Sequence, residues 1–400
     1  MISLTSQQQA MLDGAKGKAA QKALQILLAL AKIYQAEELL PVASVQIAGV
    51  SYDNLGEAGL EYLTEIADSG GRVKVFTTLN PAGMDRENWQ ALGIPPDFAR
   101  QQIRVLDAFA RMGVVTTCTC TPYLVGNLPV FGEHIAWSES SAVCYANAVL
   151  GARTNREGGP SALASALTGF TPAYGMHLEE NRKPVLTVMV ETGIHGTQSF
   201  GALGVSISHK VAHLANKPVV WIEGIQSANL EELKSFCASL ATYAGAAMFH
   251  IHGITPESSR YLKPEASISV SSKELEEAYR ELNSIQDTPV DFVSLGCPHL
   301  NLPEIARIAG MLAGKKVKKE FWITTSRPVK QLADQMGYTR IIEESGARFA
   351  TDTCCVVAPI KGRFKRMATD SAKACYYASG KNLMETVFLP FDDVIREALR

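Results

Sequence analysis

The chain has 400 residues with 46% apolar and 20% charged side chains, a composition typical of a globular protein with two or three domains. Its net charge of −2 argues against a nucleic-acid partner. The longest apolar stretch, residues 23–31, is far shorter than the roughly 20 residues that cross a membrane, and no signal peptide is apparent. We therefore expect a cytoplasmic protein that does not contact a membrane.

The first half of the chain predicts helices and short strands in irregular alternation. Apolar residues at three- and four-residue spacing predict helices over residues 8–39, 59–69, 97–112 and 140–150. Short apolar runs predict strands over residues 44–50, 73–76, 114–117, 135–137 and 185–190.

The second half alternates more regularly. Strands are predicted over residues 218–222, 247–252, 290–295, 321–325 and 348–351. Helices are predicted over residues 229–244, 272–285, 302–313 and 328–344, the last after a Ser326 cap and with Pro328 in its first turn. This alternation favours an α/β fold of parallel, doubly wound sheets flanked by helices, in two or three subdomains. We place a boundary within residues 210–217, which divides the chain into regions 1–212 and 213–400.

Three of the eight cysteines stand just past strand-like runs, far apart in the sequence: Cys120, Cys297 and Cys354. The carboxyl ends of strands form the ligand crevice of an open α/β sheet. Three thiols there would leave an iron–sulfur cluster one protein ligand short, with one iron open to substrate. The alternative for each is a small buried apolar residue, which the helical pattern around Cys237 favours for that cysteine. No CxxC pair exists, so zinc ribbons and thioredoxin-type motifs are unsupported.

Other strand ends carry small polar groups that suit a small polar substrate. They include Gly49, Val50, Ser51, Asn80, Pro81, Glu139 and Ser140. Turn and capping chemistry is the alternative, and Glu139 in particular could stabilise the first turn of a helix.

Two cationic side chains are candidates for binding an anion. Arg153 lies in a glycine-flanked loop, where it forms either an anion clamp or a structural Arg–Glu network. Lys373 either neutralises an anionic substrate or is a solvated surface charge. Among the histidines, His250 and His252 suit a core or an interface, His195 lies in a turn, and His299, two residues after Cys297, could orient a cluster.

Seven segments resemble motifs of the aconitase X family, and the resemblance runs over most of the chain. They are Gly49-Val-Ser-Tyr, Thr78-Leu-Asn-Pro-Ala-Gly-Met, Thr119-Cys-Thr-Pro-Tyr, His134-Ile-Ala-Trp-Ser-Glu-Ser-Ser-Ala-Val, Gly151-Ala-Arg-Thr-Asn-Arg-Glu-Gly-Gly-Pro-Ser, Ser294-Leu-Gly-Cys-Pro-His and Asp352-Thr-Cys. The chain is similar to the large, cluster-binding subunit of the two-subunit form. The family's small swivelling domain, which contributes a serine thought to act as base, is not visible, so the catalytic residue is expected on a partner subunit.

The resemblance implies an aconitase-like fold and a 4Fe–4S cluster with one open iron, held by Cys120, Cys297 and Cys354. Cys120 is preferred over Cys118 because it precedes Thr-Pro-Tyr, and Cys354 over Cys355 because it follows Asp-Thr. The family's substrate contacts fall on Gly49, Val50, Ser51, Asn80, Pro81, Glu139, Ser140 and Lys373.

The resemblance also implies the activity of a hydro-lyase. Similar members dehydrate mevalonate 5-phosphate, a step of isoprenoid biosynthesis, in archaea, or cis-3-hydroxy-L-proline in bacteria. We expect removal of water from mevalonate 5-phosphate to give anhydromevalonate 5-phosphate, together with a small swivel-domain subunit. The alternatives are cis-3-hydroxy-L-proline dehydration, a non-catalytic iron–sulfur sensor, and a thiol redox enzyme that uses the adjacent Cys354 and Cys355. The sequence leaves the nuclearity of the cluster and the oligomeric state open.

Overall fold

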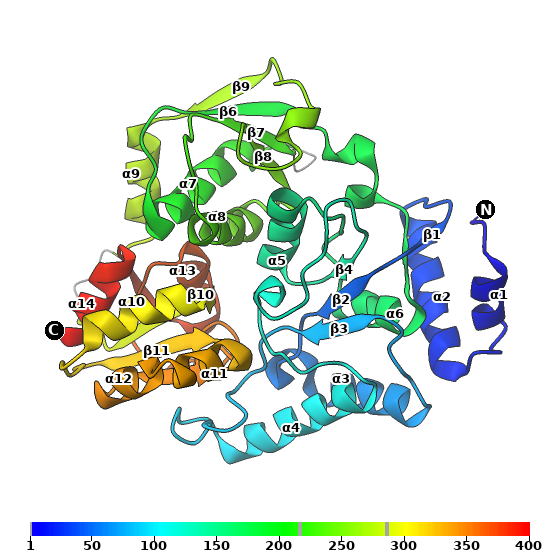
Figure 1. The fold of residues 1–400 in the computed structure, drawn as a ribbon, viewed down its shortest axis with the longest axis horizontal. Helices are drawn as coiled ribbons and strands as arrows, with labels where there is room; N and C mark the ends of the chain where they lie inside the picture. The colour runs from blue at the N-terminus through cyan, green and yellow to red at the C-terminus, as the bar shows by residue number, and fades with distance from the viewer. Residues whose placement is uncertain (1, 215–217, 285–287) are drawn as a thin grey trace.

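The structure, a computed structural model, describes residues 2–214, 218–284 and 288–400, which form three α/β lobes (Figure 1). The first lobe, blue to green in Figure 1, contains a parallel sheet in the order β3-β2-β4 and a small antiparallel pair, β1 with β5. Its strands are β1 (Leu39–Pro41), β2 (Ser44–Ile47), β3 (Phe76–Leu79), β4 (Ala136–Trp137) and β5 (Phe170–Pro172). Its helices are α1 (Ser6–Leu12), α2 (Lys18–Ile33), α3 (Tyr52–Asp68), α4 (Pro96–Arg111), α5 (Ser140–Tyr145) and α6 (Gly159–Thr168).

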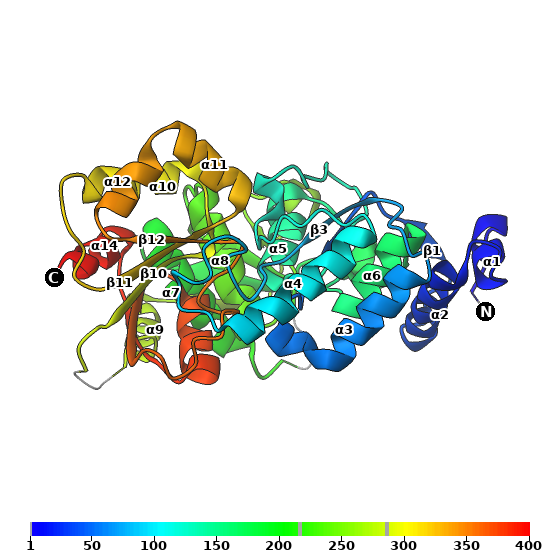
Figure 2. The ribbon, with the colours of Figure 1, turned by 90° about the horizontal axis from the view of Figure 1, so that it is seen from below.

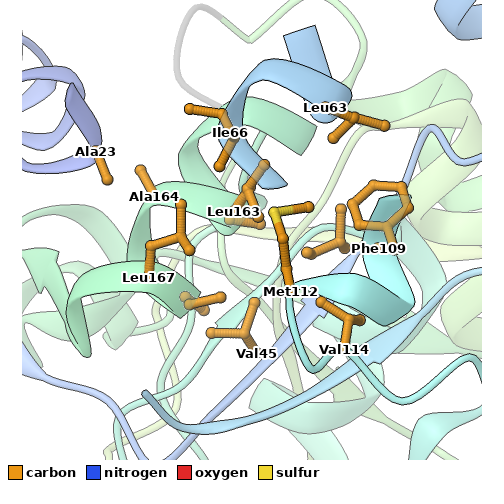
Figure 3. Close-up of a cluster of buried hydrophobic side chains, with 14 of the residues drawn as sticks. Ala23, Val45, Leu63, Ile66, Phe109, Met112, Val114, Leu163, Ala164 and Leu167 are labelled. Carbon is orange, nitrogen blue, oxygen red and sulfur yellow. The ribbon is translucent and has the colours of Figure 1, made fainter. Parts of the chain in front are cut away.

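Apolar faces of α2, α3, α4 and α6 pack with β2 and β3 in one core. Helices α3 and α4 lie side by side across the lobe (Figure 2). Figure 3 shows Val45 of β2, Leu163 of α6 and Met112, which follows α4, gathered in the core of the lobe, and all three are buried. This packing fixes where strands β2, β3 and β4 end, and therefore where their following loops lie.

The second lobe, at the top of Figure 1, contains a parallel sheet in the order β8-β7-β6-β9. Its strands are β6 (Leu186–Val190), β7 (Val220–Glu223), β8 (Phe249–Ile251) and β9 (Ser267–Val270), and its helices are α7 (Gly196–Val211), α8 (Leu230–Tyr243) and α9 (Ser272–Glu281). A capping box of Asn229 and Glu232 starts α8 one residue after its predicted start.

The third lobe contains a parallel sheet in the order β12-β11-β10-β13-β14. Its strands are β10 (Phe292–Leu300), β11 (Glu320–Thr325), β12 (Arg348–Thr351), β13 (Arg366–Thr369) and β14 (Glu385–Phe388). Its helices are α10 (Leu302–Leu312), α11 (Arg327–Gln335), α12 (Tyr338–Glu344), α13 (Ala372–Tyr377) and α14 (Phe391–Leu399). Helices α10, α11 and α12 cover one face of this sheet (Figure 2).

The predicted α/β class with parallel sheets is confirmed, and the predicted Ser326 cap with Pro328 in the first turn is present. Several predicted boundaries are wrong. The helix predicted over residues 8–39 is two helices, because Gly14 and Gly17 adopt left-handed φ values of 84° and 92° between them. Gly337, with a φ of 77°, similarly divides the helix predicted over residues 328–344.

Other differences follow from short or shifted strands. The strand predicted over residues 73–76 lies at β3 instead, and the one predicted over 114–117 is a single bridge between Thr78 and Val115. The helix predicted over residues 140–150 continues from α5 as a π-helical turn over Ala146–Leu150. The elements β1, β5, β9, β13, β14, α6, α7, α13 and α14 were not predicted.

The division into regions 1–212 and 213–400 stays a prediction, since residues 215–217 of its boundary lie outside the described part of the chain. Residue 285, the predicted end of a helix, also lies outside it. Within the described residues, no helix combines the length and the apolar character that crossing a membrane requires.

Candidate active site

Loops at the carboxyl ends of the parallel sheets of the first and third lobes contact one another. The Ala82 N–H, after β3, donates to the Asp352 carbonyl, after β12, at 2.9 Å. The Ser51 hydroxyl donates to the Val357 carbonyl at 3.4 Å. Loops that follow strands in both lobes therefore form one shared site, as the crevice rule for α/β sheets predicts.

An ion pair between Lys373 and Glu139 spans the two lobes. Glu139 caps α5, where its carboxylate accepts from the Ser141 hydroxyl at 3.1 Å, and it also accepts from Asn80 Nδ2 at 2.7 Å. Lys373 lies in the first turn of α13, with its Nζ 3.5 Å from the Ser141 hydroxyl. Lys373 is buried, so the alternative of a solvated surface charge is wrong.

The ion pair keeps both buried groups charged. Burial raises the pKa of Glu139, but Lys373, Asn80 and Ser141 outweigh it and hold that pKa at about 2. Burial lowers the pKa of Lys373, but Glu139 and nearby cysteines raise it above its ordinary value. One acceptor in this group is unused: the buried Asn80 Oδ1 has no hydrogen-bond partner among the described residues. A substrate hydroxyl is a donor of the kind that this oxygen requires.

The loop containing Gly49, Val50 and Ser51 is held against the loop after β3 by one side chain, Gln102 of α4. Its Nε2 donates to the Val50 carbonyl at 3.0 Å, and its Oε1 accepts from the Gly83 N–H at 3.0 Å. A Cβ at Gly83 would overlap Phe98 Cζ and lie 2.7 Å from the Ser51 hydroxyl oxygen, so a larger residue there would have to displace these side chains. Pro81 is buried between Asn80 and this contact.

Gln102 has a structural role at the site that the sequence reasoning missed. It is fully buried although it lies within an amphipathic helix. A polar residue on the apolar face of a helix is the signal that could have found it, since buried polar side chains require partners.

The three candidate cysteines come from loops or strand ends of the shared site. Cys297 lies in the carboxyl-terminal part of β10, Cys354 follows β12, and Cys120 precedes a 3₁₀ turn over Pro122–Leu124. Of their two neighbours, Cys118 packs in the apolar core of the first lobe, and Cys355 packs in an apolar cluster with Trp322 against which Cys297 also packs.

The three thiols are close enough to affect one another electrostatically. Burial raises the pKa of all three, that of Cys120 to about 12, while Lys373 lowers each of them. The Cys354, Cys355 and Cys120 thiols also raise the pKa of Cys297. The His299 N–H donates to Cys120 Sγ at 3.2 Å, and backbone N–H groups of Val356 and Val357 favour the thiolate of Cys354.

This donor set fits an iron–sulfur cluster. Thiolates ligate iron, and N–H groups that point at the sulfurs and a nearby ammonium offset their charge. Among the described residues, no three His, Cys, Asp or Glu side chains converge closely enough to hold a single metal ion. The thiolates of a cluster bind different irons, so their sulfurs need not converge on one point.

The structure places the two other predicted residues, Ser140 and Arg153, differently. Ser140 lies at the site and its hydroxyl donates to Glu139 at 3.5 Å. Arg153 forms an ion pair with Glu179 and donates to the His177 carbonyl at 3.1 Å, which are the partners of a structural Arg–Glu network. No hydrogen bond between described residues joins Arg153 to the Lys373–Glu139 pair.

The histidines also separate. His250 is buried, and its Nε2 lies 2.8 Å from the Arg182 carbonyl, as expected of a core residue. His195 lines a cavity of about 550 Å³ between the second and third lobes, which is a different place from the cysteine loops. His299 alone of these three contacts those loops.

Family models match all three lobes. The aconitase X first-domain model matches residues 1–180, the second-domain model residues 184–280, and the third-domain model residues 290–400. The chain belongs to the aconitase X family. The resemblance of the seven motifs is thereby confirmed.

Aconitase X relatives and a solved structure match over the whole chain. A protein of Methanothermobacter thermautotrophicus named phosphomevalonate dehydratase large subunit is 45% identical over 99% of this chain and 98% of its own length. A Methanocaldococcus jannaschii protein of the same name is 42% identical over 98% of this chain and 99% of its own length. A crystal structure of Thermococcus kodakaraensis aconitase X in its holo-form matches with a TM-score of 0.92 and 40% identity, over 99% of this chain and 100% of that one.

Another branch of relatives is longer. A cis-3-hydroxy-L-proline dehydratase of Hypocrea jecorina is 35% identical over 95% of this chain, but the match spans only 65% of that relative. About a third of that enzyme therefore has no counterpart in this chain.

Proposed function

We propose that this chain is the large subunit of an iron–sulfur-dependent hydro-lyase that converts mevalonate 5-phosphate into anhydromevalonate 5-phosphate. The structural observation that carries the proposal is the buried Lys373–Glu139 pair, which lies beside the three thiols in a site shared by two lobes. The choice of substrate is supported by relatives of 41–45% identity that are named phosphomevalonate dehydratase large subunit. The cis-3-hydroxy-L-proline dehydratases are more distant, at 34–35% identity.

In this proposal Cys120, Cys297 and Cys354 hold a 4Fe–4S cluster. When bound, a cluster with an open iron supplies a Lewis acid for a departing hydroxyl group. The support for Cys120 over Cys118 and for Cys354 over Cys355 is that Cys118 and Cys355 belong to apolar clusters; Cys297, the third thiol, packs against the cluster of Cys355.

The chain's own residues bind and orient the substrate. Lys373 stays protonated beside Glu139, and its remaining N–H groups can donate to a carboxylate or phosphate oxygen. In this proposal Asn80 Oδ1 accepts from the substrate hydroxyl, and its lack of a hydrogen-bond partner among the described residues supports this role. The Gly49–Ser51 loop, fixed by Gln102, forms the neighbouring wall. Arg153 is left out of this site because Glu179 already pairs with its guanidinium.

The proton that leaves with the hydroxyl comes from the carbon next to the carboxylate. We assign its removal to a serine of a small swivel-domain subunit. The name "large subunit" of the relatives and the additional third of the single-chain cis-3-hydroxy-L-proline dehydratases support a separate small partner. We place this two-chain enzyme in the cytoplasm.

Anaerobic reconstitution with iron and sulfide, with and without the small subunit, tests the proposal. Both chains together are expected to dehydrate mevalonate 5-phosphate, measured as formation of the conjugated product. The large chain alone is expected to show almost no activity. Turnover of cis-3-hydroxy-L-proline but not of mevalonate 5-phosphate would refute the choice of substrate, and full activity of the large chain alone would refute the partner base.

A further inference from the structure

His299 lies in the strand that carries Cys297 and is hydrogen-bonded to the loops that carry the other two candidate cluster ligands. It lies two residues after Cys297 in β10. Its backbone N–H donates to Cys120 Sγ at 3.2 Å. Its imidazole bridges the other two loops, because Nδ1 lies 3.0 Å from the Thr119 hydroxyl and Nε2 lies 3.0 Å from the Thr353 carbonyl.

The direction of each hydrogen bond follows from the chemistry of the partners. A carbonyl oxygen only accepts, so His299 Nε2 carries the proton and donates to Thr353. Nδ1 of the neutral ring is then the acceptor, and it receives the Thr119 hydroxyl proton. The Thr119 oxygen in turn accepts from the Thr121 N–H at 3.2 Å, so the Cys120 loop is tied to the ring on both sides of the cysteine.

No polar group of His299 is left free. The fourth, its carbonyl oxygen, accepts from Lys234 Nζ at 3.1 Å, and Lys234 is itself paired with Glu304 at 2.5 Å. The side chain is fully buried. Loss of the ring would therefore leave Thr119 and Thr353 without these partners in a place that water does not reach.

We infer that His299 is a positioning residue that fixes the three cysteine loops relative to one another for cluster binding. This inference rests on the proposed function for the identity of the cluster. Its geometric part, that one side chain holds the Cys120 and Cys354 loops to the strand of Cys297, concerns the chain without cofactor as well.

The test compares His299→Ala and His299→Gln with His250→Ala. His250 is a matched control, because it is also a fully buried histidine bonded to a carbonyl, but it contacts none of the cysteine loops. The first measurement is iron and sulfide content after anaerobic reconstitution. The second is the iodoacetamide alkylation rate of each cysteine in the cofactor-free chain, resolved by peptide mass spectrometry. The buried Cys144 and Cys237 report global opening.

His299→Ala is expected to lose most of the cluster and to speed alkylation of Cys120 and Cys354 by about tenfold or more, because two buried hydrogen bonds are lost. His299→Gln retains a donor and an acceptor and is expected to recover part of both effects. His250→Ala should leave both measurements as in the wild type.

Unchanged iron content and unchanged alkylation in His299→Ala would overturn the inference. Equal acceleration at Cys144 and Cys237 would also overturn it, because the effect would then be global. If the wild type takes up no cluster, the proposed function fails, and the alkylation comparison still decides the role of His299.

Discussion

Removing the ammonium of Lys373 while keeping Glu139 tests the central ion pair most directly. Lys373→Met leaves the carboxylate buried without its cation, and breaking a buried pair in this way typically costs about 3–5 kcal/mol. The structure gives a similar figure: a Glu139 pKa of about 2 against an ordinary 4.5 corresponds to about 3 kcal/mol. We therefore expect a loss of about 3 kcal/mol in the free energy of unfolding at pH 7.

The pH dependence of this loss has a definite sign. In the wild type the pKa of Glu139 is depressed, so its contribution to stability is present above pH 4.5 and is lost as the pH falls toward 2. In Lys373→Met the effect of burial dominates and raises the pKa of Glu139. The Glu139 carboxyl group then becomes protonated as the pH falls, and the neutral form no longer destabilises the folded state. The stability gap between the two proteins should therefore narrow as the pH falls from 7 toward 4.

Urea unfolding followed by fluorescence measures the gap, with the single variant Glu139→Gln and the double variant Lys373→Met/Glu139→Gln completing the cycle. The double variant is expected to regain most of the loss, because no unpaired charge remains. Lys22→Met removes an exposed pair with Glu65 and serves as control, with an expected loss below about 1 kcal/mol. If each single variant loses less than about 1 kcal/mol in the free energy of unfolding and the two losses add in the double variant, the buried ion pair does not stabilise the protein as argued.

Three further predictions concern the cluster ligands and the walls of the site. Cys297→Ser should lose the cluster and its visible absorbance while remaining folded, whereas Cys355→Ser should keep its iron; wild-type iron content in the first would remove Cys297 from the ligand set. Gln102→Leu should raise KM about tenfold or more, since it releases two loops at once, and an unchanged KM would show that the loops hold without it. Arg153→Ala should lose at most about 1 kcal/mol of stability with KM unchanged, and a large rise in KM would restore its role as an anion clamp.

The sequence predicted which polar residues and cysteines lie just after strands better than it predicted the first and last residue of each strand. Asn80 and Cys354 follow strands whose apolar runs are recognisable, and parallel strands must present their carboxyl ends together. Lys373 was harder to place, because β13 before it has only two apolar residues and was not predicted. Lys373 is buried by its contact with the first lobe, and the sequence around Lys373 carries no sign of this distant contact.

The roles that the sequence did not predict depend on contacts between segments that are distant along the chain. The loop with Arg153 has the composition of an anion site, but Glu179 pairs with this arginine from another segment. Gln102 and His299 likewise owe their roles to partners 52 and 180 residues away along the chain. Periodicity and composition predict local secondary structure, whereas the hydrogen-bond and ion-pair partners of these side chains depend on how the lobes pack together.

The two residues of the ion pair that spans the lobes are synthesised at different times. Lys373 and Glu139 are 234 residues apart, so at about 5–20 residues per second the ribosome adds the lysine roughly 10–50 s after the glutamate. For most of that interval Cys120 is present without Cys354. Loading of the proposed cluster then belongs to the finished polypeptide rather than to the nascent one.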